Sequence, residues 1–216
     1  TKTEDGGARP INADRPIKTE EISAEHYRLV LSEGDLAGVC QEIEAAGRVA
    51  FAIVTNSGRL LDAEVFGLAL CAEKGKAHYI PLLHQFLGVP KQLELGAVLK
   101  ALTPIAKNPR IRKIGIEIKA IYELFERAGI TMVGLDFDGA IASYLLDPDG
   151  GAEGVSHDLR ETAARFLGAS VTTLDDLLGR GKQKREYPGI PLEEALIFLG
   201  TQADIALRAA DAGKPL

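Results

Sequence analysis

The 216-residue chain has no tryptophan, one methionine and two cysteines, and aromatic residues make up only 6% of it. Its 25 lysine and arginine residues are outnumbered by 31 aspartate and glutamate residues, which gives a formal net charge of −6 at pH 7. This acidic balance argues against a protein that coats nucleic acid through a generally basic surface. No apolar run approaches the roughly 18 residues that span a membrane, and nothing resembles a signal peptide. We therefore expect a cytoplasmic protein without a membrane partner.

Cysteine and histidine show no arrangement typical of a metal centre. Cys40 and Cys71 could form a disulfide or a metal pair, but both lie in apolar segments, and free cysteine is among the residues most often buried. We therefore interpret them as small buried hydrophobes. The four histidines have no spacing typical of zinc sites and are interpreted as structural: His26, His78, His84 and His157.

The rest of the composition is ordinary for a globular domain with a sizeable core, with 46% hydrophobic and 26% charged residues. Residues 1–21 mix glycine, proline and charges of both signs without a hydrophobic period, which is typical of a flexible tail or an interdomain linker. Residues 22–216 are expected to form one domain.

Strand-like and helix-like segments alternate from residue 22 onward. Arg48–Thr55 is a continuous apolar run, typical of a strand buried on both faces. Segments 65–71 and 76–82 flank Glu73-Lys74-Gly75, which predicts a hairpin. The other expected strands are 27–31, 113–116 and 131–135, and the expected helices are 36–46, 92–105, one ending at 127, 138–146, 157–167, 173–178 and 192–212.

This order predicts the fold class. A hairpin comes first, strand–helix alternation follows, and helices end the chain. Such an order implies an α/β domain with a mixed central sheet, antiparallel early and parallel later, with flanking helices.

Five collinear segments resemble a known family. They are VFGLALCAEKGKAHYIPLLH (65–84), KIGIEIKAIYELFERAGI (113–130), GLDFDGAIASYLLDP (134–148), GRGKQK (179–184) and LEEALIFLGTQADIAL (192–207). Together they are similar to the 3′–5′ proofreading exonuclease domain of bacterial DNA polymerase I, a family A polymerase. The resemblance covers about residues 22–212 and implies a ribonuclease-H-like fold.

The resemblance also implies a reaction. Members of the family remove nucleotides from a DNA 3′ end with two divalent cations, Mg²⁺ or Mn²⁺, which activate a water and stabilise the leaving oxygen. Hard cations need oxygen ligands, so four carboxylates converge on the site. Two of them are two residues apart on one strand and therefore lie on the same face of it. A third lies on the helix after the second conserved motif, and the last helix supplies a tyrosine and the fourth carboxylate.

This chain carries no carboxylate at any of the four positions. Ala52 and Val54 replace the two on the strand, and Ile121 replaces the one after the second motif. On the last helix, Phe198 stands at the tyrosine position and Gln202 at the carboxylate position. We therefore expect an inactive, vestigial exonuclease domain without metal or cofactor. It would serve as a structural scaffold beside the polymerase domain of a DNA polymerase I, in DNA replication and repair.

Two other functions are considered. The first is a module that keeps single-strand DNA contacts without hydrolysis, using the basic cluster Arg180, Lys182, Lys184 and Arg185 on a glycine-containing loop. The low aromatic content offers few platforms for stacking bases.

The second is a nuclease with a shifted metal site, built from the three acidic residues that remain near the family's motifs. We interpret Asp138 as a helix cap, and Glu117 and Asp204 as solvated or hydrogen-bonded surface groups. Ser156, His157 and Asp158 are adjacent in sequence, whereas catalytic triads are assembled from distant segments, so we do not interpret them as a triad.

Overall fold

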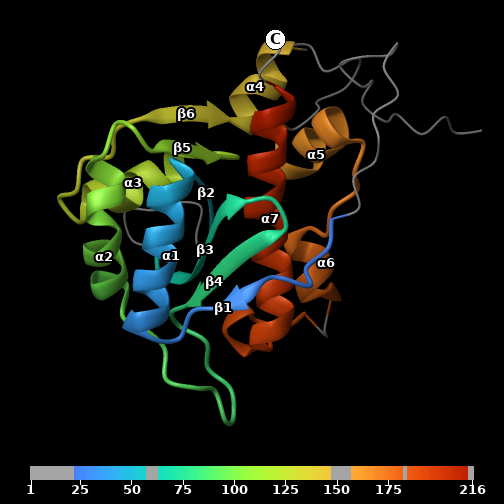
Figure 1. Ribbon diagram of the computed structural model, residues 1–216. Helices are drawn as coiled ribbons and strands as arrows, with labels where there is room; N and C mark the ends of the chain where they lie inside the picture. The colour runs from blue at the N-terminus through green and yellow to red at the C-terminus, as the bar shows by residue number, and fades with distance from the viewer. Residues whose placement is uncertain (1–21, 57–62, 147–156, 182–183, 214–216) are drawn as a thin grey trace, which may run out of the picture.

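The computed structural model describes residues 22–56, 63–146, 157–181 and 184–213 (Figure 1). A six-stranded sheet runs through the described part in the order β1-β4-β3-β2-β5-β6. The strands are β1 (Arg28–Leu29), β2 (Arg48–Thr55), β3 (Val65–Glu73), β4 (Lys76–Pro81), β5 (Arg112–Gly115) and β6 (Leu135–Asp138). The helices are α1 (Glu33–Ala46), α2 (Leu95–Lys107), α3 (Lys119–Arg127), α4 (Gly139–Leu146), α5 (Leu159–Leu167), α6 (Leu174–Leu178) and α7 (Leu192–Ala212).

The sheet is mixed, as the order of elements predicts. β3 and β4 form the expected antiparallel hairpin, and β2 is antiparallel to β3. β5 then pairs in parallel with β2, and β6 pairs in parallel with β5. The short β1 departs from the expectation of an antiparallel start, because it pairs in parallel with β4 at the sheet edge.

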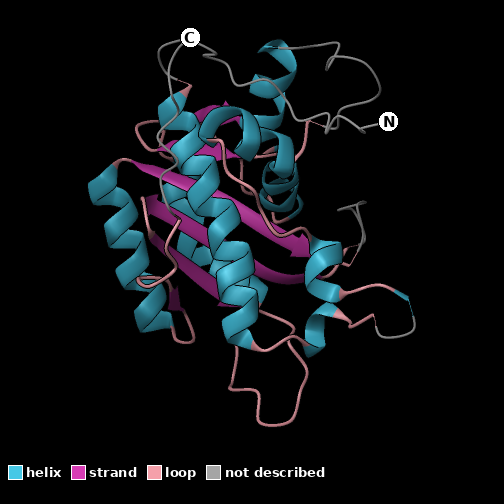
Figure 2. Cartoon of the chain, turned by 90° about the vertical axis from the view of Figure 1, so that its right-hand side faces the viewer, coloured by secondary structure: helices cyan, strands magenta, loops and turns pink. Residues whose placement is uncertain are grey.

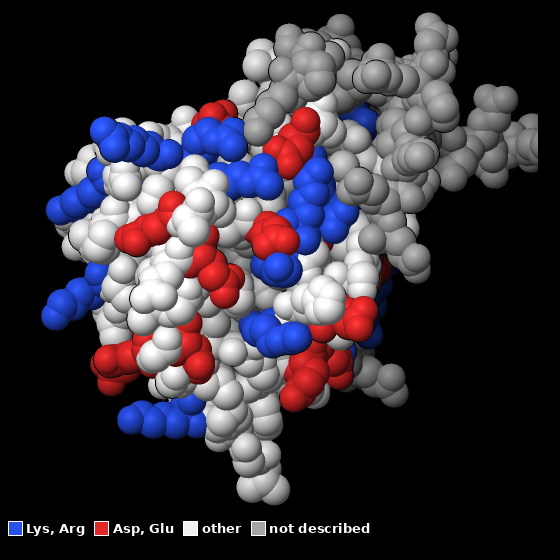
Figure 3. Space-filling view, viewed as in Figure 1, with Lys and Arg blue, Asp and Glu red and all other residues white. Residues whose placement is uncertain are grey.

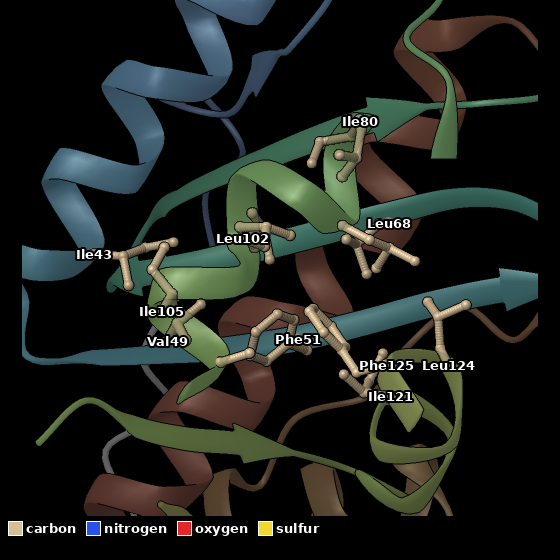
Figure 4. Close-up of a cluster of buried hydrophobic side chains, with 14 of the residues drawn as sticks. Ile43, Val49, Phe51, Leu68, Ile80, Leu102, Ile105, Ile121, Leu124 and Phe125 are labelled. Carbon is tan, nitrogen blue, oxygen red and sulfur yellow. The ribbon is translucent and has the colours of Figure 1, made fainter. Parts of the chain in front are cut away.

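Helices cover both faces of this sheet (Figure 2), and the strands face two separate apolar cores. The central strand β2 shows the division, since its successive side chains point to opposite faces. Val49 and Phe51 pack into the first core with residues of α1, α2 and α3, and Phe51 meets Phe125 edge to face at 6.2 Å (Figure 4). Ala50 and Val54 pack into the second core against α7.

α7 is the longest helix, with 21 residues, and crosses β2, β3 and β4 on the second face. Small residues let it lie close to the sheet. A Cβ at Gly200 would come within 2.9 Å of the Tyr27 ring and 3.2 Å of Ala77. The second core is therefore built between one long helix and the middle of the sheet.

Sequence signals mark several helix ends. Ser32 and Asp35 form a reciprocal capping box at the start of α1, and Gly47 ends it in the left-handed region at φ 64°. Thr173 and Asp176 form a second capping box on α6. These local devices satisfy amide groups that the helices leave unpaired.

The last strand was misplaced by its sequence pattern. The alternation over 131–135 predicts a strand there, whereas β6 begins only at Leu135. Gly134 adopts φ 74°, and a Cβ at this position would lie 2.9 Å from the Ile111 carbonyl oxygen. Met132 is buried, although it lies in a segment without regular secondary structure. Because of the backbone turn at Gly134, pairing of β6 with β5 begins only at Leu135. Asp138 is therefore the last residue of a strand and not the first residue of a helix.

The cysteines match their sequence interpretation in part. Both are free, Cys71 is buried in the second core, and Cys40 is half-buried against the first core. Among the described residues, no helix is both long and apolar enough to cross a bilayer. Residues 1–21 lie outside the described part, so the division into a tail and one domain stays a prediction.

Candidate active site

A pocket of about 430 Å³ lies where β2 and β5 diverge. The parallel pairing of these strands ends at Phe51 opposite Gly115, while β2 continues to Thr55 alongside β3. The residues that follow β5 lead into α3. The last part of β2 therefore has no neighbouring strand on the β5 side. This pocket, called the cleft below, is lined by Phe51, Ala52, Ile53, Thr55, Ile116, Glu117, Lys119, Ala120, Ile121, Glu123, Leu159 and Gln202.

The cleft brings together three of the five positions singled out from the sequence. Ala52 on β2, Ile121 on α3 and Gln202 on α7 all line it. Ile121 has a second role: it is only 2% exposed and packs in the first core beside Phe51 and Phe125 (Figure 4). The position is therefore shared between the cleft wall and the core.

The other two positions lie in the second core. Val54 and Phe198 are buried there and do not line the cleft. Val54 is two residues from Ala52, and both pack on the second core face of β2, as the alternation of a strand requires. Val54 and Phe198 are thus part of the second core and not of the cleft wall.

The polar groups of the cleft are few. Lys119 Nζ lies 3.5 Å from Glu123 Oε1, one turn along α3. Glu117 is exposed and adopts φ 58°, the one positive φ that the described residues show outside glycine. Thr55 and Gln202 complete the polar lining.

These residues do not fit a centre with two divalent cations. The four positions at which the sequence resemblance places ligands hold a methyl group, two branched alkyl groups and a neutral amide, whereas Mg²⁺ and Mn²⁺ need several anionic oxygens. Glu117 and Glu123 are the acidic side chains of the lining, and Glu123 is paired with Lys119. Within the described ranges, no three His, Cys, Asp or Glu side chains are grouped as metal ligands would be.

Asp138 caps α4, as expected, and does more. Its Oδ1 accepts the backbone N–H groups of Ala140 (2.9 Å) and Glu117 (3.1 Å), and its Oδ2 accepts that of Ile118 (2.9 Å). The carboxylate thus joins the start of α4 to the loop before α3 and holds Glu117 in its left-handed conformation.

Asp204 is fully buried, so its interpretation as a surface group was wrong. Its Oδ1 accepts from Gly75 N and from Arg208 Nε, both at 3.0 Å, and its Oδ2 accepts from the Tyr27 hydroxyl at 3.0 Å. Burial, followed by the charge of Asp204, raises the pKa of Tyr27 far above its usual value. The carboxylate ties α7 to the start of the sheet, away from the cleft.

Comparison with known proteins decides the family. Residues 62–200 match the family model of the DNA polymerase I, ribonuclease H-like domain. The chain belongs to this family. Its sequence is 31% identical over 198 residues to DNA polymerase I of Pseudomonas aeruginosa, which covers 91% of this chain and 21% of that protein. It spans about a fifth of the length of the curated relatives it matches.

Solved structures show the same exonuclease fold. The EXO domain of Aedes aegypti Nibbler has a TM-score of 0.65 at 16% identity, covering 91% of each chain. The POL domain of Pol1 from M. smegmatis, in complex with DNA primer-template and dNTP, has a TM-score of 0.60 at 22% identity, covering 87% of this chain and 27% of that one. The ribonuclease-H-like fold predicted from the sequence is confirmed.

Two of the four cations in the basic loop of this DNA polymerase I domain are paired with nearby acids. Lys184 Nζ lies 3.5 Å from Asp175 Oδ1, and Arg185 lies 3.0 Å from Glu194 and donates to the Leu177 carbonyl. Arg180 is exposed, and Lys182 lies outside the described residues. On the face shown in Figure 3, basic and acidic side chains are likewise interspersed.

A second hollow of about 700 Å³ adjoins this loop. Lys184 and Arg185 line it together with Val54, and the ring of Phe66 stacks on that of Tyr187 at 5.8 Å and 11° in its wall. It is separate from the cleft except for the shared Thr55.

Three of the four histidines, His78, His84 and His157, have contacts that fit the structural role expected of them. His84 is 2% exposed, its Nδ1 lies 3.0 Å from the Ile190 carbonyl, and its Nε2 lies 2.6 Å from the Tyr79 hydroxyl. Burial lowers the pKa of His84, so the ring is neutral, donates through Nδ1 and accepts from Tyr79. The one sequence signal related to this network is Gly67. A Cβ at this position would overlap the Tyr79 ring, so a glycine is needed there.

The adjacent Ser156, His157 and Asp158 form no triad in the described part. His157 Nδ1 lies 3.0 Å from Ser143 Oγ on α4, and Asp158 caps α5 by accepting the Glu161 N–H at 3.1 Å. Ser156 lies outside the described residues.

Proposed function

We propose that this chain is an inactive 3′–5′ exonuclease domain of a DNA polymerase I, and that it acts as a structural scaffold beside the polymerase domain in DNA replication and repair. The observation that carries the proposal is the cleft itself. Ala52, Ile121 and Gln202 line it where family members would place metal ligands, while Val54 and Phe198 are packed in the core below.

The chemistry supports inactivity. Without two cations, no water is deprotonated at neutral pH, and the charge that develops on the leaving 3′ oxygen is not stabilised. Electrostatic stabilisation in such a site lowers the activation barrier by several kcal/mol. Loss of a single stabilising group slows the reaction by a factor on the order of 10²–10³. No neighbouring side chain of the cleft replaces it.

The scaffold role is supported by the packing. Three of the four positions, Ala52, Val54 and Ile121, contribute apolar side chains to the two cores, so the domain gains burial where active relatives would hold repelling charges. If a domain keeps its fold after losing its active site, we expect that the fold is retained because its surface contacts another domain.

The test is a titration of Mn²⁺ into the purified 216-residue chain by calorimetry, with a 3′-labelled single-strand degradation assay on the same sample. We expect neither saturable heat nor shortening of the strand. The matched positive control is the fivefold variant Ala52→Asp, Val54→Glu, Ile121→Asp, Phe198→Tyr and Gln202→Asp. Metal-dependent shortening by the unmodified chain would overturn the proposal.

A DNA-binding module without hydrolysis is the second candidate. The second hollow, with Lys184, Arg185 and the stacked Phe66–Tyr187 pair, favours it. The ion pairs of both cations with Asp175 and Glu194 weaken it, because neutralised side chains release fewer counterions from a phosphate backbone. Filter binding of single-stranded DNA at several salt concentrations separates the two: micromolar binding with a steep salt slope supports the module, and its absence supports the scaffold.

A shifted metal site built from Glu117, Asp138 and Asp204 has the least support. Asp138 uses both oxygens for backbone amides, and Asp204 is enclosed in a separate cluster with Tyr27 and Arg208. If the unmodified chain did shorten DNA, loss of that activity in Glu117→Ala would identify such a site.

A further inference from the structure

The helix α4 carries its large apolar side chains outward. Its eight residues, GAIASYLL, include no charged residue, and the two that it buries are Gly139 and Ser143. Ile141 is 59% exposed and Leu145 is 70% exposed, and Tyr144 and Leu146 are also exposed. These four side chains, Ile141, Tyr144, Leu145 and Leu146, are called the α4 patch below.

Close packing on the inner side fixes this orientation. A Cβ at Gly139 would lie 2.8 Å from both Ile116 Cγ1 and Thr162 Cγ2, which is too close for any side chain. Ser143 Oγ lies 3.0 Å from His157 Nδ1 and anchors the next turn. Rotating α4 to bury Ile141 or Leu145 would bring larger groups into this space, so the α4 patch cannot turn inward.

The concentration of exposed apolar residues is unusual for a surface helix. Amphipathic helices of globular proteins place the apolar stripe towards the core, and a helix that is apolar all round is normally covered on both sides. Four of the ten large hydrophobic side chains exposed in the described residues lie in this one helix, so they form a patch and not isolated exceptions. Such patches mark surfaces that bind another apolar surface.

The position of the α4 patch indicates what covers it. α7 ends beside it, since α4 contacts α7 and the end of α7 at Gly213 packs against Phe137 of β6 and Phe166 of α5 (Figure 1). The curated relatives are about five times as long as the matched part. A domain that follows Gly213 in such a chain starts next to the α4 patch, and a short tether gives it an effective concentration on the order of millimolar there.

We propose that the α4 patch is the docking surface for the folded domain that follows Gly213 in the parent chain, which presents an uncharged apolar face to Ile141 and Leu145. Under the proposed function this partner is the polymerase domain, so the inference rests on that function and assigns its contact surface. The absence of charge on α4 makes an apolar face the complementary partner, because an ionic group placed against it would be desolvated without an opposite charge.

The test compares site-resolved maleimide labelling of Leu145→Cys in the 216-residue chain and in the full-length parent chain. The control is Leu87→Cys, a fully exposed leucine in the loop between β4 and α2, at the opposite end of the molecule from α4 (Figure 1). We expect labelling at position 145 to be at least about tenfold slower in the full-length chain, as for a residue held at a tethered interface. Labelling at position 87 should be the same in both.

Other results overturn the assignment in distinguishable ways. Slow labelling at 145 already in the 216-residue chain would mean that a second copy covers the α4 patch if the effect depends on concentration, or a segment of this chain if it does not. Protection at 87 but not at 145 would leave the scaffold in place through another face. Protection at neither position would contradict the docking surface alone, because the scaffold could still contact its partner through a third face. The degradation assay on the same full-length sample reports separately on inactivity.

Discussion

Gln202 and Asp204 lie two residues apart on α7 and have opposite surroundings. Gln202 faces the cleft, at a position where the sequence resemblance predicts a carboxylate in active relatives. Asp204 points into the protein and accepts hydrogen bonds from Tyr27, Gly75 and Arg208. The amide of Gln202 thus faces the cleft, whereas the carboxylate of Asp204 is fully buried among hydrogen-bond donors.

The difference separates two kinds of polar residue. A carboxylate that binds metal contributes nothing to the fold without its metal and repels its neighbours, so its loss is neutral or stabilising. A buried carboxylate that satisfies three donors from three segments cannot be removed without leaving those donors unpaired. A helix can therefore lose a metal-binding carboxylate and still keep one that stabilises the fold.

The largest expected effect comes from Asp204→Ala. It would remove one acceptor from each of the Arg208 guanidinium, the Tyr27 hydroxyl and the Gly75 amide, at a cost of about 3–5 kcal/mol in the free energy of unfolding. Urea denaturation measures this loss of stability. Gln202→Ala is the control, and its free energy of unfolding is expected to lie within about 0.5 kcal/mol of that of the unmodified chain. Equal effects of the two changes would show that Asp204 has no special structural role.

The next effect tests whether a lost ligand position has become part of the core. Ile121→Asp restores the family's carboxylate but places it in the first core beside Phe51 and Phe125. We expect a loss of about 2–4 kcal/mol in metal-free buffer, since the change removes apolar burial and adds an unpaired polar group.

Ile121→Val is the control for that change, with an expected cost of about 0.5–1.5 kcal/mol. Thermal denaturation of both variants measures the difference. If Ile121→Asp were no worse than Ile121→Val, position 121 would belong to the open cleft and not to the core.

A smaller, pH-dependent effect concerns the His84 network, another buried polar group outside the cleft. Because the pKa of His84 is lowered in the folded protein, the folded state binds fewer protons than the unfolded chain below about pH 6.5. The contribution of neutral His84 to the free energy of unfolding is complete above that pH. It is lost as the pH falls, by up to about 1.4 kcal/mol per pH unit.

Urea denaturation between about pH 5 and about pH 7.5 checks the direction. His84→Gln should flatten the dependence, whereas the exposed His26, changed in the same way, should leave it unaltered. A dependence that survives in His84→Gln would assign it to other groups.

The smallest effect is expected for Gln202→Asp, which restores one carboxylate at a half-buried cleft position. The free energy of unfolding should change by less than about 0.5 kcal/mol. One carboxylate cannot bind two cations, so calorimetry should detect no saturable Mn²⁺ binding. Binding by this single variant would mean that the cleft needs only one group to recover a metal site.

Much of the fold follows from local sequence. Arg48–Thr55 and Leu192–Ala212 have the predicted bounds, because a continuous apolar run and a long helical period leave few alternatives. The strand expected at 131–135 was wrong, because the left-handed turn at Gly134 sets the register of β6 and depends on its close approach to Ile111. Of the expected cleft residues, Ala52, Ile121 and Gln202 meet in the cleft, while Val54 and Phe198 are absorbed by the core.

The sequence by itself determined the order and type of most elements, and it led to the prediction that the four ligand positions of the family carry no carboxylate here, since both are inferred from residues read one segment at a time. Only the tertiary structure decided that Asp204 is buried, that Ile121 belongs to a core as well as the cleft, and that α4 presents its apolar side chains outward. The physical reason is that burial depends on segments far apart in the chain. Tyr27 and Asp204 are 177 positions apart and meet only because α7 packs across the sheet.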